Sequence, residues 1–249
     1  MGIGKAVAIH YIDKGWHVGV TDINATALET FKKEYGDQIA YAAIMDVTNE
    51  TQVTKVIDDF AQTADGKIDF FSNNAGVGWG DLFTEQPLSN HPQTIDIHSK
   101  GIATCAYRAF PYLKNAGATL VNMCSQSANY GVPYGTTDAA SKFFVRGFTE
   151  GLNIEWQKFG VYVCAIWPNF VERPMVGNIA DHPGPVLERI GVRLTVKDVV
   201  KTIEKAIVLK KMHLAHWHVD TLFWKMSALM SSILPHAVSR YFMKSMARL

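Results

Sequence analysis

The segment YGTTDAASKFF (134–144) contains three side chains that could take part in proton transfer. Ser141 and Lys142 are adjacent, and Asp138 would lie one helical turn before Lys142 on the same face of a helix. The ordinary pKa of an aspartic acid is about 3.9, and a neighbouring ammonium group lowers it further. Asp138 is therefore expected to be ionised at neutral pH. It could accept a proton from an alcohol but could not donate one to an alkoxide.

The composition is typical of a folded α/β protein. The chain has 249 residues, 48% hydrophobic and 19% charged, with a formal net charge of +1. This charge gives no electrostatic case for nucleic-acid binding, and no apolar run is long enough for a transmembrane helix. The three cysteines stand in apolar runs without a pairing pattern, as reduced cysteines do, and no signal peptide is recognisable. We therefore expect a cytoplasmic protein.

Short apolar runs rich in β-branched residues alternate with longer helical patterns. Strands that are apolar throughout, each followed by a helix, predict a parallel sheet covered on both faces, the doubly wound Rossmann-type α/β fold. We predict strands at 16–22, 38–46, 68–73, 118–125 and 161–167 and helices at 25–36, 49–64 (with Asn49 as N-cap), within 90–115, at 138–158 and at 196–210.

The C-terminal residues 220–249 differ in composition from the domain that we assign to residues 1–219. They are rich in Met, Leu and aromatic side chains with Lys and Arg spaced among them, and Pro235 is expected to divide them into two helices. Met and aromatic stripes favour a helical tail that packs on the domain or on a second subunit. A peripheral contact with a membrane surface is the alternative.

The glycines near the N-terminus could form part of a phosphate-binding turn. In GIGKAVA, Gly2 and Gly4 would let the backbone around Ile3 approach a pyrophosphate at a helix N-terminus. Asp22, followed by Ile23, ends the first predicted strand, where a carboxylate can accept hydrogen bonds from the hydroxyl groups of an adenosine ribose. A simple strand-end or helix-cap aspartate is the alternative.

Two further motifs follow predicted strands: SNNAG (72–76) and MDV (45–47). With the glycine turn, they resemble the short-chain dehydrogenase/reductase family, in order and spacing, from Gly2 to about residue 209. The resemblance implies NAD(P) as cofactor, and Asp22 favours NAD over NADP. It implies the following cofactor-binding residues: Gly2, Ile3, Gly4, Asp22, Ile23, Asp46, Val47, Asn74, Ala75, Gly76, Lys142 and Pro168.

The resemblance also implies a catalytic set, which the family builds from Ser, Tyr, Lys and Asn. Ser125 matches the Ser that holds the substrate oxygen, and Lys142 matches the Lys that binds the nicotinamide ribose. Asp138 stands at the position of the Tyr, and His98 at the position of the Asn that orders a water in a proton relay. Ser141 is assigned no catalytic role.

Further departures surround the same reaction centre. In PNFVERP, Asn169 replaces the family's Gly and Arg173 its Thr. Because Asp138 is shorter than Tyr, Tyr134 or Tyr130 could take its place, although either could equally be a wall of the pocket. His98 could relay protons, since the unperturbed imidazole pKa is about 6.5, or be a partly exposed helix residue.

Two other patterns carry expectations. The chain begins after the position of the family's first strand, so we expect a longer natural chain and, in this sequence, a sheet that lacks that strand. His213, His216 and His218 could suggest a metal, but no carboxylate or cysteine joins them closely in the sequence, and we assign no metal site.

Together these features predict a short-chain dehydrogenase/reductase-like oxidoreductase that transfers a hydride between NAD(P) and a carbonyl or secondary alcohol. The loop 177–194 would cover the pocket and suggests an uncharged or apolar small-molecule substrate. The resemblance implies a homodimer or homotetramer formed through the helices at 90–115 and 138–158. The alternative is a non-catalytic, nucleotide-sensing or protein-interaction module with the same fold.

Overall fold

The computed structural model describes residues 2–172, 185–215 and 236–248. Its strands all run parallel and form two sheets. The first consists of β1 (Gly19–Asp22) and β2 (Tyr41–Ile44), and the second of β3 (Phe70–Asn73), β4 (Thr119–Met123), β5 (Tyr162–Ile166) and β6 (His213–Leu214), in that order. No strand among the described residues joins β1 to β3, as predicted for a sheet without its first strand.

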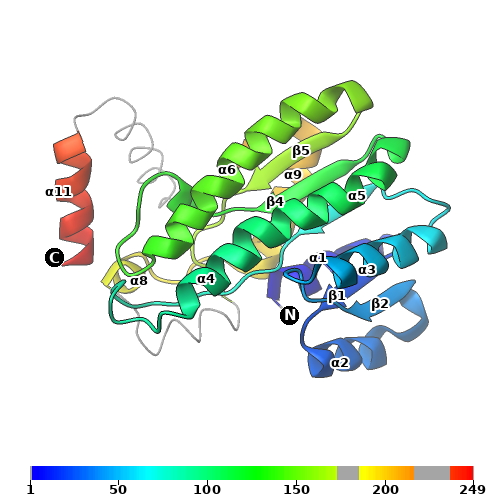
Figure 1. Cartoon of the computed structure of the whole chain (residues 1–249), viewed down its shortest axis with the longest axis horizontal. Helices are drawn as coiled ribbons and strands as arrows, with labels where there is room; N and C mark the ends of the chain where they lie inside the picture. The colour runs from blue at the N-terminus through cyan, green and yellow to red at the C-terminus, as the bar shows by residue number, and fades with distance from the viewer. Residues whose placement is uncertain (1, 173–184, 216–235, 249) are drawn as a thin grey trace.

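Helices cover both faces of the four-stranded sheet, because successive residues of the buried strands point to opposite sides (Figure 1). Leu120 of β4 packs into a core with α3 (Glu50–Thr63) and α5 (Ile102–Ala116), next to α6 (Thr136–Trp156). Its neighbour Val121 packs into a second core with α1 (Gly2–Asp13) and α9 (Val196–Leu209). Helix α2 (Ala25–Tyr35) packs against α1 through a smaller cluster. The predicted doubly wound fold is confirmed.

The predicted helix within 90–115 consists of three consecutive segments. It starts as α4 (Asn90–Ile95), widens into a π-helical turn at Asp96–Gly101, and continues as α5. Such single π-helical turns occur frequently at functional sites. His98 lies inside this turn and is only 1% exposed, so the alternative of a partly exposed helix histidine was wrong.

Local sequence signals explain several helix ends. Asn49 accepts a hydrogen bond from the backbone N–H of Gln52 and is the N-cap of α3, as predicted, while Asn24 caps α2 in the same way. Thr195 and Asp198 form a reciprocal capping box at α9. The remaining elements are α8 (Pro185–Ile190), α11 (His236–Ala247) and short 3₁₀ turns at Gly36–Gln38, Gln126–Ala128 and Gln157–Phe159.

The described part of the C-terminal tail packs on the domain. Helix α11 starts directly after Pro235, and its Ala247 is buried with Val186 of α8 against the partly buried Tyr134 and Phe170. Arg248 also lies 3.2 Å from Glu188 of α8. The other helix predicted for the tail falls in 216–235, outside the described residues. None of the helices in the described ranges is long and apolar enough to cross a membrane.

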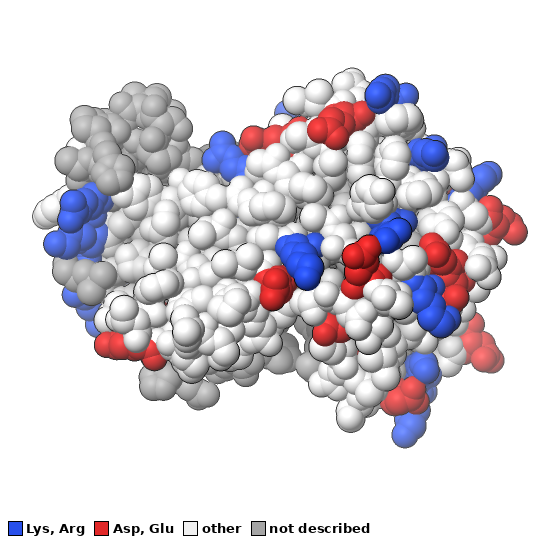
Figure 2. Space-filling model, viewed as in Figure 1, with Lys and Arg blue, Asp and Glu red and all other residues white. Residues whose placement is uncertain are grey.

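Charged side chains of both signs are intermingled on the face shown in Figure 2, chiefly around α2, α3 and α5. Lys and Arg side chains gather on the outer side of α11, where Arg240, Lys244 and Arg248 are exposed. The mixed pattern over the rest of this face agrees with the net charge of +1.

Candidate active site

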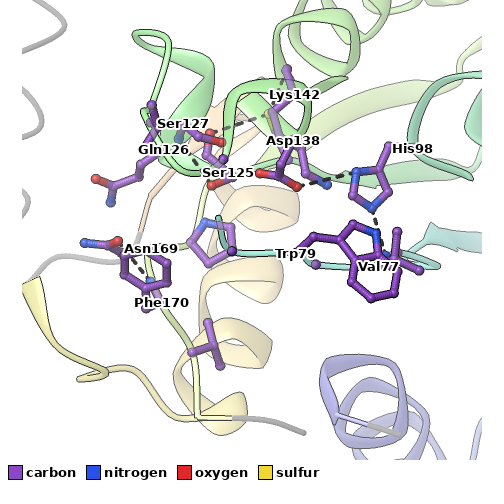
Figure 3. Close-up of a pocket in the computed structure, with 18 of the residues that line it drawn as sticks. Val77, Trp79, His98, Ser125, Gln126, Ser127, Asp138, Lys142, Asn169 and Phe170 are labelled. Atoms are coloured by element: carbon purple, nitrogen blue, oxygen red, sulfur yellow. Dashed lines mark hydrogen bonds and ion pairs between the residues drawn. The ribbon is translucent and has the colours of Figure 1, made fainter. Parts of the chain in front are cut away.

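A pocket of about 150 Å³ lies at the carboxyl ends of β3, β4 and β5 (Figure 3). In parallel α/β sheets this edge is where ligands bind, because the loops that leave the strands meet there. The start of α6 and part of α8 complete its walls. The pocket brings together these residues predicted from the sequence: Ser125, Asp138, Lys142, His98, Asn74, Ala75, Gly76 and Pro168.

Lys142 reaches the pocket from α6 and is 8% exposed. Its ammonium group donates a hydrogen bond to the backbone carbonyl of Met123, at 3.4 Å, where β4 ends. Asp138 lies one turn earlier on the same helix, as the spacing predicted, and its side chain is 35% exposed. A cation and a carboxylate thus enter the pocket from one helix.

Asp138 has a second partner in the π-helical turn. Its Oδ1 lies 3.5 Å from Nδ1 of His98, whose side chain is buried. Figure 3 shows the carboxylate between His98 and Ser125 in this view. The two positions at which the sequence departs from the family's Tyr and Asn therefore form a contact with each other.

His98 also contacts the loop after β3. Its Nε2 accepts a hydrogen bond of 2.9 Å from the backbone N–H of Val77. Val77 directly follows the Asn74–Gly76 turn. The imidazole thus connects this turn to α6. The widened helical turn at 96–101 places the ring between them.

Ser141 belongs to the same network, which the sequence did not reveal. Its Oγ lies 3.0 Å from Nδ1 of His98 and donates a hydrogen bond of 2.6 Å to the backbone carbonyl of Asp138. Assigning no role to Ser141 therefore overlooked a contact that forms only when α6 packs against the π-helical turn.

Ser125 lies two residues after the end of β4 and lines the pocket with its neighbours Gln126 and Ser127. Its Oγ accepts a hydrogen bond from the backbone N–H of Ser127 at 3.2 Å, which orients the hydroxyl group. The adjacent Cys124 is buried, and burial raises the pKa of its thiol to about 11. At neutral pH Cys124 is therefore a neutral thiol, a weaker hydrogen-bonding group than the hydroxyl of Ser125 beside it.

The N-terminus of α1 has the properties of a phosphate-binding turn. Gly2 has a positive φ of 60°, which favours glycine, and the first turn of the helix contains no acidic residue. Gly4 lies so near Asn74 that an added Cβ would come within 2.8 Å of its Nδ2. Ile3 is 1% exposed and its side chain is in the core, so only its backbone could face a cofactor.

The remaining predicted cofactor residues follow the ends of β1 and β2, outside the pocket lining. Asp22 pairs in register with Ile44, and its Oδ1 accepts a hydrogen bond from the backbone N–H of Asn24 at 2.9 Å. The N-cap of α2 is thus Asn24 rather than Asp22. Ile23 is 65% exposed.

Asp46 and Val47 occupy the turn after β2. The carboxylate Oδ1 of Asp46 accepts hydrogen bonds from both the backbone N–H and the hydroxyl of Thr48, each at 2.8 Å. Val47 packs so closely on Gly101 that a Cβ there would lie 2.8 Å from its Cγ2. Asp22 ends β1, Asp46 and Val47 follow β2, and the Asn74 turn follows β3. All of these residues thus lie at the carboxyl ends of parallel strands, where dinucleotides bind in this type of fold.

Several pocket residues were not identified from the sequence. Trp79 Nε1 and Gln126 Oε1 are buried and have no hydrogen-bond partner among the described residues, so both could meet a bound molecule. Tyr134 lines the pocket and packs near Val186, which supports its reading as a wall. No periodicity marks these residues, since they come from loops that meet only in the folded chain.

The turn after β5, where Asn169 and Arg173 differ from the residues usual in the family, lies partly within the described residues. Asn169 lines the pocket, and its Oδ1 accepts a hydrogen bond from the backbone N–H of Phe170 at 2.9 Å. Arg173 lies outside the described residues. Of the predicted pocket cover at 177–194, Val186 and Leu187 line the pocket, and 177–184 lie outside the described residues.

His213 has a carboxylate neighbour that its sequence context did not show. Its Nε2 lies 3.0 Å from Oε1 of Glu150, which also binds Arg146. Burial lowers the pKa of His213, and the hydrogen bond to Glu150 acts in the opposite direction. Within the described ranges there is no group of three or more side chains suited to a metal, and His216 and His218 fall outside those ranges.

Comparison with known proteins agrees with this geometry. Residues 1–184 match the short chain dehydrogenase family. The chain is 30% identical over 185 residues to a 3-oxoacyl-(acyl-carrier-protein) reductase, FabG, of Thermotoga maritima, covering 72% of this chain and 74% of that enzyme. It is 31% identical over 193 residues to a D-threitol dehydrogenase of Mycolicibacterium smegmatis, covering 76% and 74%.

Solved structures show the same fold. A short-chain dehydrogenase/reductase from Burkholderia phymatum in complex with NAD superposes with a TM-score of 0.76 at 22% identity, covering 90% of this chain and 88% of that one. An alcohol dehydrogenase from Thermococcus sibiricus complexed with 5-hydroxy-NADP gives 0.73 at 20% identity, covering 86% and 91%.

The fold and the site thus define an NAD(P)-binding oxidoreductase of Rossmann type. The chain belongs to the short-chain dehydrogenase/reductase family. The alternative of a non-catalytic module is not favoured by these relatives.

Proposed function

We propose that this protein transfers a hydride between NAD(P) and the carbon of a secondary alcohol or carbonyl group held in the pocket beside Ser125. The observation that carries the proposal is the convergence of Ser125, Asp138 and Lys142 on one pocket bordered by the Asn74–Gly76 turn. These groups come from β4, α6 and the loop after β3, and they meet only through the fold.

Each of the three residues would have its own role, set by where it lies in the pocket. The hydroxyl of Ser125 is oriented by the backbone of Ser127 and would donate a hydrogen bond to the substrate oxygen. The ammonium group of Lys142, which lies at the carboxyl end of β4, would bind the hydroxyl groups of the nicotinamide ribose. Asp138 would exchange a proton with the substrate oxygen. When bound, the nicotinamide supplies or accepts the hydride.

The cofactor fits the remaining predicted residues. The pyrophosphate would lie against the glycines at the start of α1. Gly4 has no side chain to fill the space beside Asn74. The buried Oδ1 of Asn74 has no hydrogen-bond partner among the described residues and could accept one from the bound dinucleotide. Asp46, Val47 and Ile23 would border the adenosine at the ends of β1 and β2.

We further propose that NAD is preferred over NADP. Asp22 ends β1, where its carboxylate would accept hydrogen bonds from the ribose hydroxyls of NAD and repel the extra phosphate of NADP.

The pocket favours a small, largely apolar substrate. Its outer wall contains Val132, Tyr134, Phe170, Val186 and Leu187, and the last two are at most 8% exposed. The family resemblance favours a homodimer or homotetramer, formed through α4–α5 and α6. A membrane contact through the basic outer side of α11 stays a prediction.

The proposal is tested by following nicotinamide absorbance with a panel of apolar secondary alcohols and ketones. Ser125→Ala should lower kcat/KM about 10²- to 10³-fold, as loss of a single donor to a reacting oxygen does. Ser89→Ala is the control, because Ser89 is exposed and its hydroxyl makes no capping hydrogen bond. Equal activity of Ser125→Ala and wild type, or absence of nucleotide binding by calorimetry, would contradict the proposal.

A further inference from the structure

We infer that His98 and Ser141 are positioning residues that hold Asp138 as the proton acceptor of this site. The inference rests on the proposed function and adds to it two positioning residues. It starts from the hydrogen-bond directions around one buried imidazole.

The position of the proton on His98 follows from its partners. A backbone N–H can only donate, so Nε2 of His98 must accept the hydrogen bond from Val77 at 2.9 Å. The neutral imidazole then carries its single proton on Nδ1. A second proton on Nε2 would face the N–H of Val77 and place a charge on a side chain that is 1% exposed. His98 is therefore a neutral donor through Nδ1.

The proton on Nδ1 points to Asp138 and Ser141. Ser141 donates its own hydroxyl proton to the carbonyl of Asp138 at 2.6 Å, so its oxygen is free to accept from Nδ1 at 3.0 Å. The carboxylate Oδ1 of Asp138 is the other acceptor, at 3.5 Å. Nδ1 of His98 and the hydroxyl of Ser141 thus each have an acceptor in this network.

A carboxylate held 3.5 Å from this N–H is suited to accepting a proton. The titratable side chains that line the pocket with it are His98 from the π-helical turn, Lys142 from α6 and Cys124 just after β4. The Lys142 cation on the same helix favours the ionised form of Asp138, and the neutral thiol of Cys124 does not oppose it.

Asp138 would act in this way when a secondary alcohol is oxidised. The hydroxyl proton of the substrate moves to the carboxylate of Asp138, and the hydrogen on the adjacent carbon leaves with both bonding electrons to the oxidised nicotinamide. The C–O bond becomes a carbonyl. Because the Asp138 side chain is 35% exposed, the proton can pass from it to water. Since aspartate is shorter than tyrosine, the substrate oxygen must sit close to the first turn of α6, where Gly135 and Asp138 both line the pocket.

The decisive variant is Asp138→Asn, which keeps the shape and removes the proton acceptor. Its kcat for alcohol oxidation should fall about 10²- to 10⁴-fold, as loss of a general base does, while nucleotide affinity measured by calorimetry stays near that of the wild type. The control is Asp65→Asn, since Asp65 is exposed and its positive φ of 51° suits asparagine. Equal kcat for Asp138→Asn and wild type would overturn the inference.

Ser141→Ala tests the positioning role. It should lower kcat without raising the KM for the nucleotide, and ¹⁵N NMR of the imidazole should show wild-type His98 protonated on Nδ1 at neutral pH. A resonance pattern with the proton on Nε2 would refute the assigned network, whatever the activity. Turnover that the Asp138→Asn variant retains refutes only the proton-acceptor role, whereas failure of the wild type on every substrate refutes the proposed function.

Discussion

Gly4 and Asn74 approach so closely that a Cβ on residue 4 would lie 2.8 Å from Nδ2 of Asn74. Gly4→Ala should displace the Asn74 side chain and weaken NAD(P) binding by about 1 kcal/mol, the worth of a typical hydrogen bond. This corresponds to a roughly fivefold higher Kd, measurable by calorimetry. Gly151→Ala in α6 is the matched control, because a Cβ there meets no heavy atom within 4 Å. If both variants bind alike, Asn74 does not border the cofactor.

Asp22 should set the choice between the two nucleotides. Asp22→Asn removes the charge that would repel the phosphate of NADP, so the ratio of kcat/KM for NADP over NAD should rise by about tenfold, or about 1.4 kcal/mol. Steady-state rates with both nucleotides measure this ratio, with Asp37→Asn on the exposed turn after α2 as control. An unchanged ratio would argue against contact between Asp22 and the ribose.

Asn122 should be important for stability. It is 0% exposed, accepts a hydrogen bond from Asn73 at 2.9 Å and donates one to Thr149 at 3.0 Å, joining β3, β4 and α6. Asn122→Leu leaves the Asn73 amide short of a partner and should lower the free energy of unfolding by about 1–3 kcal/mol. Urea unfolding measures the change, and the exposed Asn115→Ala should stay within about 0.5 kcal/mol of wild type. A neutral Asn122→Leu would mean that the amides re-pair elsewhere.

His213 should make stability depend on pH. Burial lowers its pKa below the ordinary value of 6.5, so the unfolded chain binds its proton more readily than the folded one. Its contribution to stability is therefore complete above pH 6.5 and is lost as the pH falls from there toward the folded pKa. Urea unfolding between pH 8 and pH 5 gives the free energy of unfolding of the wild type and of His213→Asn. The difference between these two free energies should shrink as the pH falls. A constant difference would show that the histidine is not buried as a neutral group.

Much of the fold could be predicted because it follows from periodicity. The apolar runs that contain β4 and β5 are buried on both faces, and Asn49 caps α3 by a local hydrogen bond that its position in the sequence already suggests. Strand limits were set too wide: the run at 38–46, for example, is a strand only over Tyr41–Ile44. Its first residue, Gln38, ends a 3₁₀ turn, and its last residues lie in the turn held by Asp46.

The pocket was predictable wherever a side chain follows the end of a strand. Ser125 and Asn74 are such residues, and the resemblance to the family assigned them and Lys142 to the site. Ser141 and Trp79 could not be found in this way. The contact of Ser141 with His98 depends on how a π-helical turn packs against another helix, and the indole of Trp79 enters the pocket from a loop without regular structure.

The π-helical turn at Asp96–Gly101 has one more consequence. An α-helix advances about 100° per residue, and a π turn accommodates about one residue more than an α turn. The faces of α4 and α5 are therefore out of phase, so that His98 reaches Ser141 of α6 while Cys105, Ala109 and Leu113 of α5 face the core. Deletion of one residue within the turn would restore a single phase and rotate one of these two faces away from its partner.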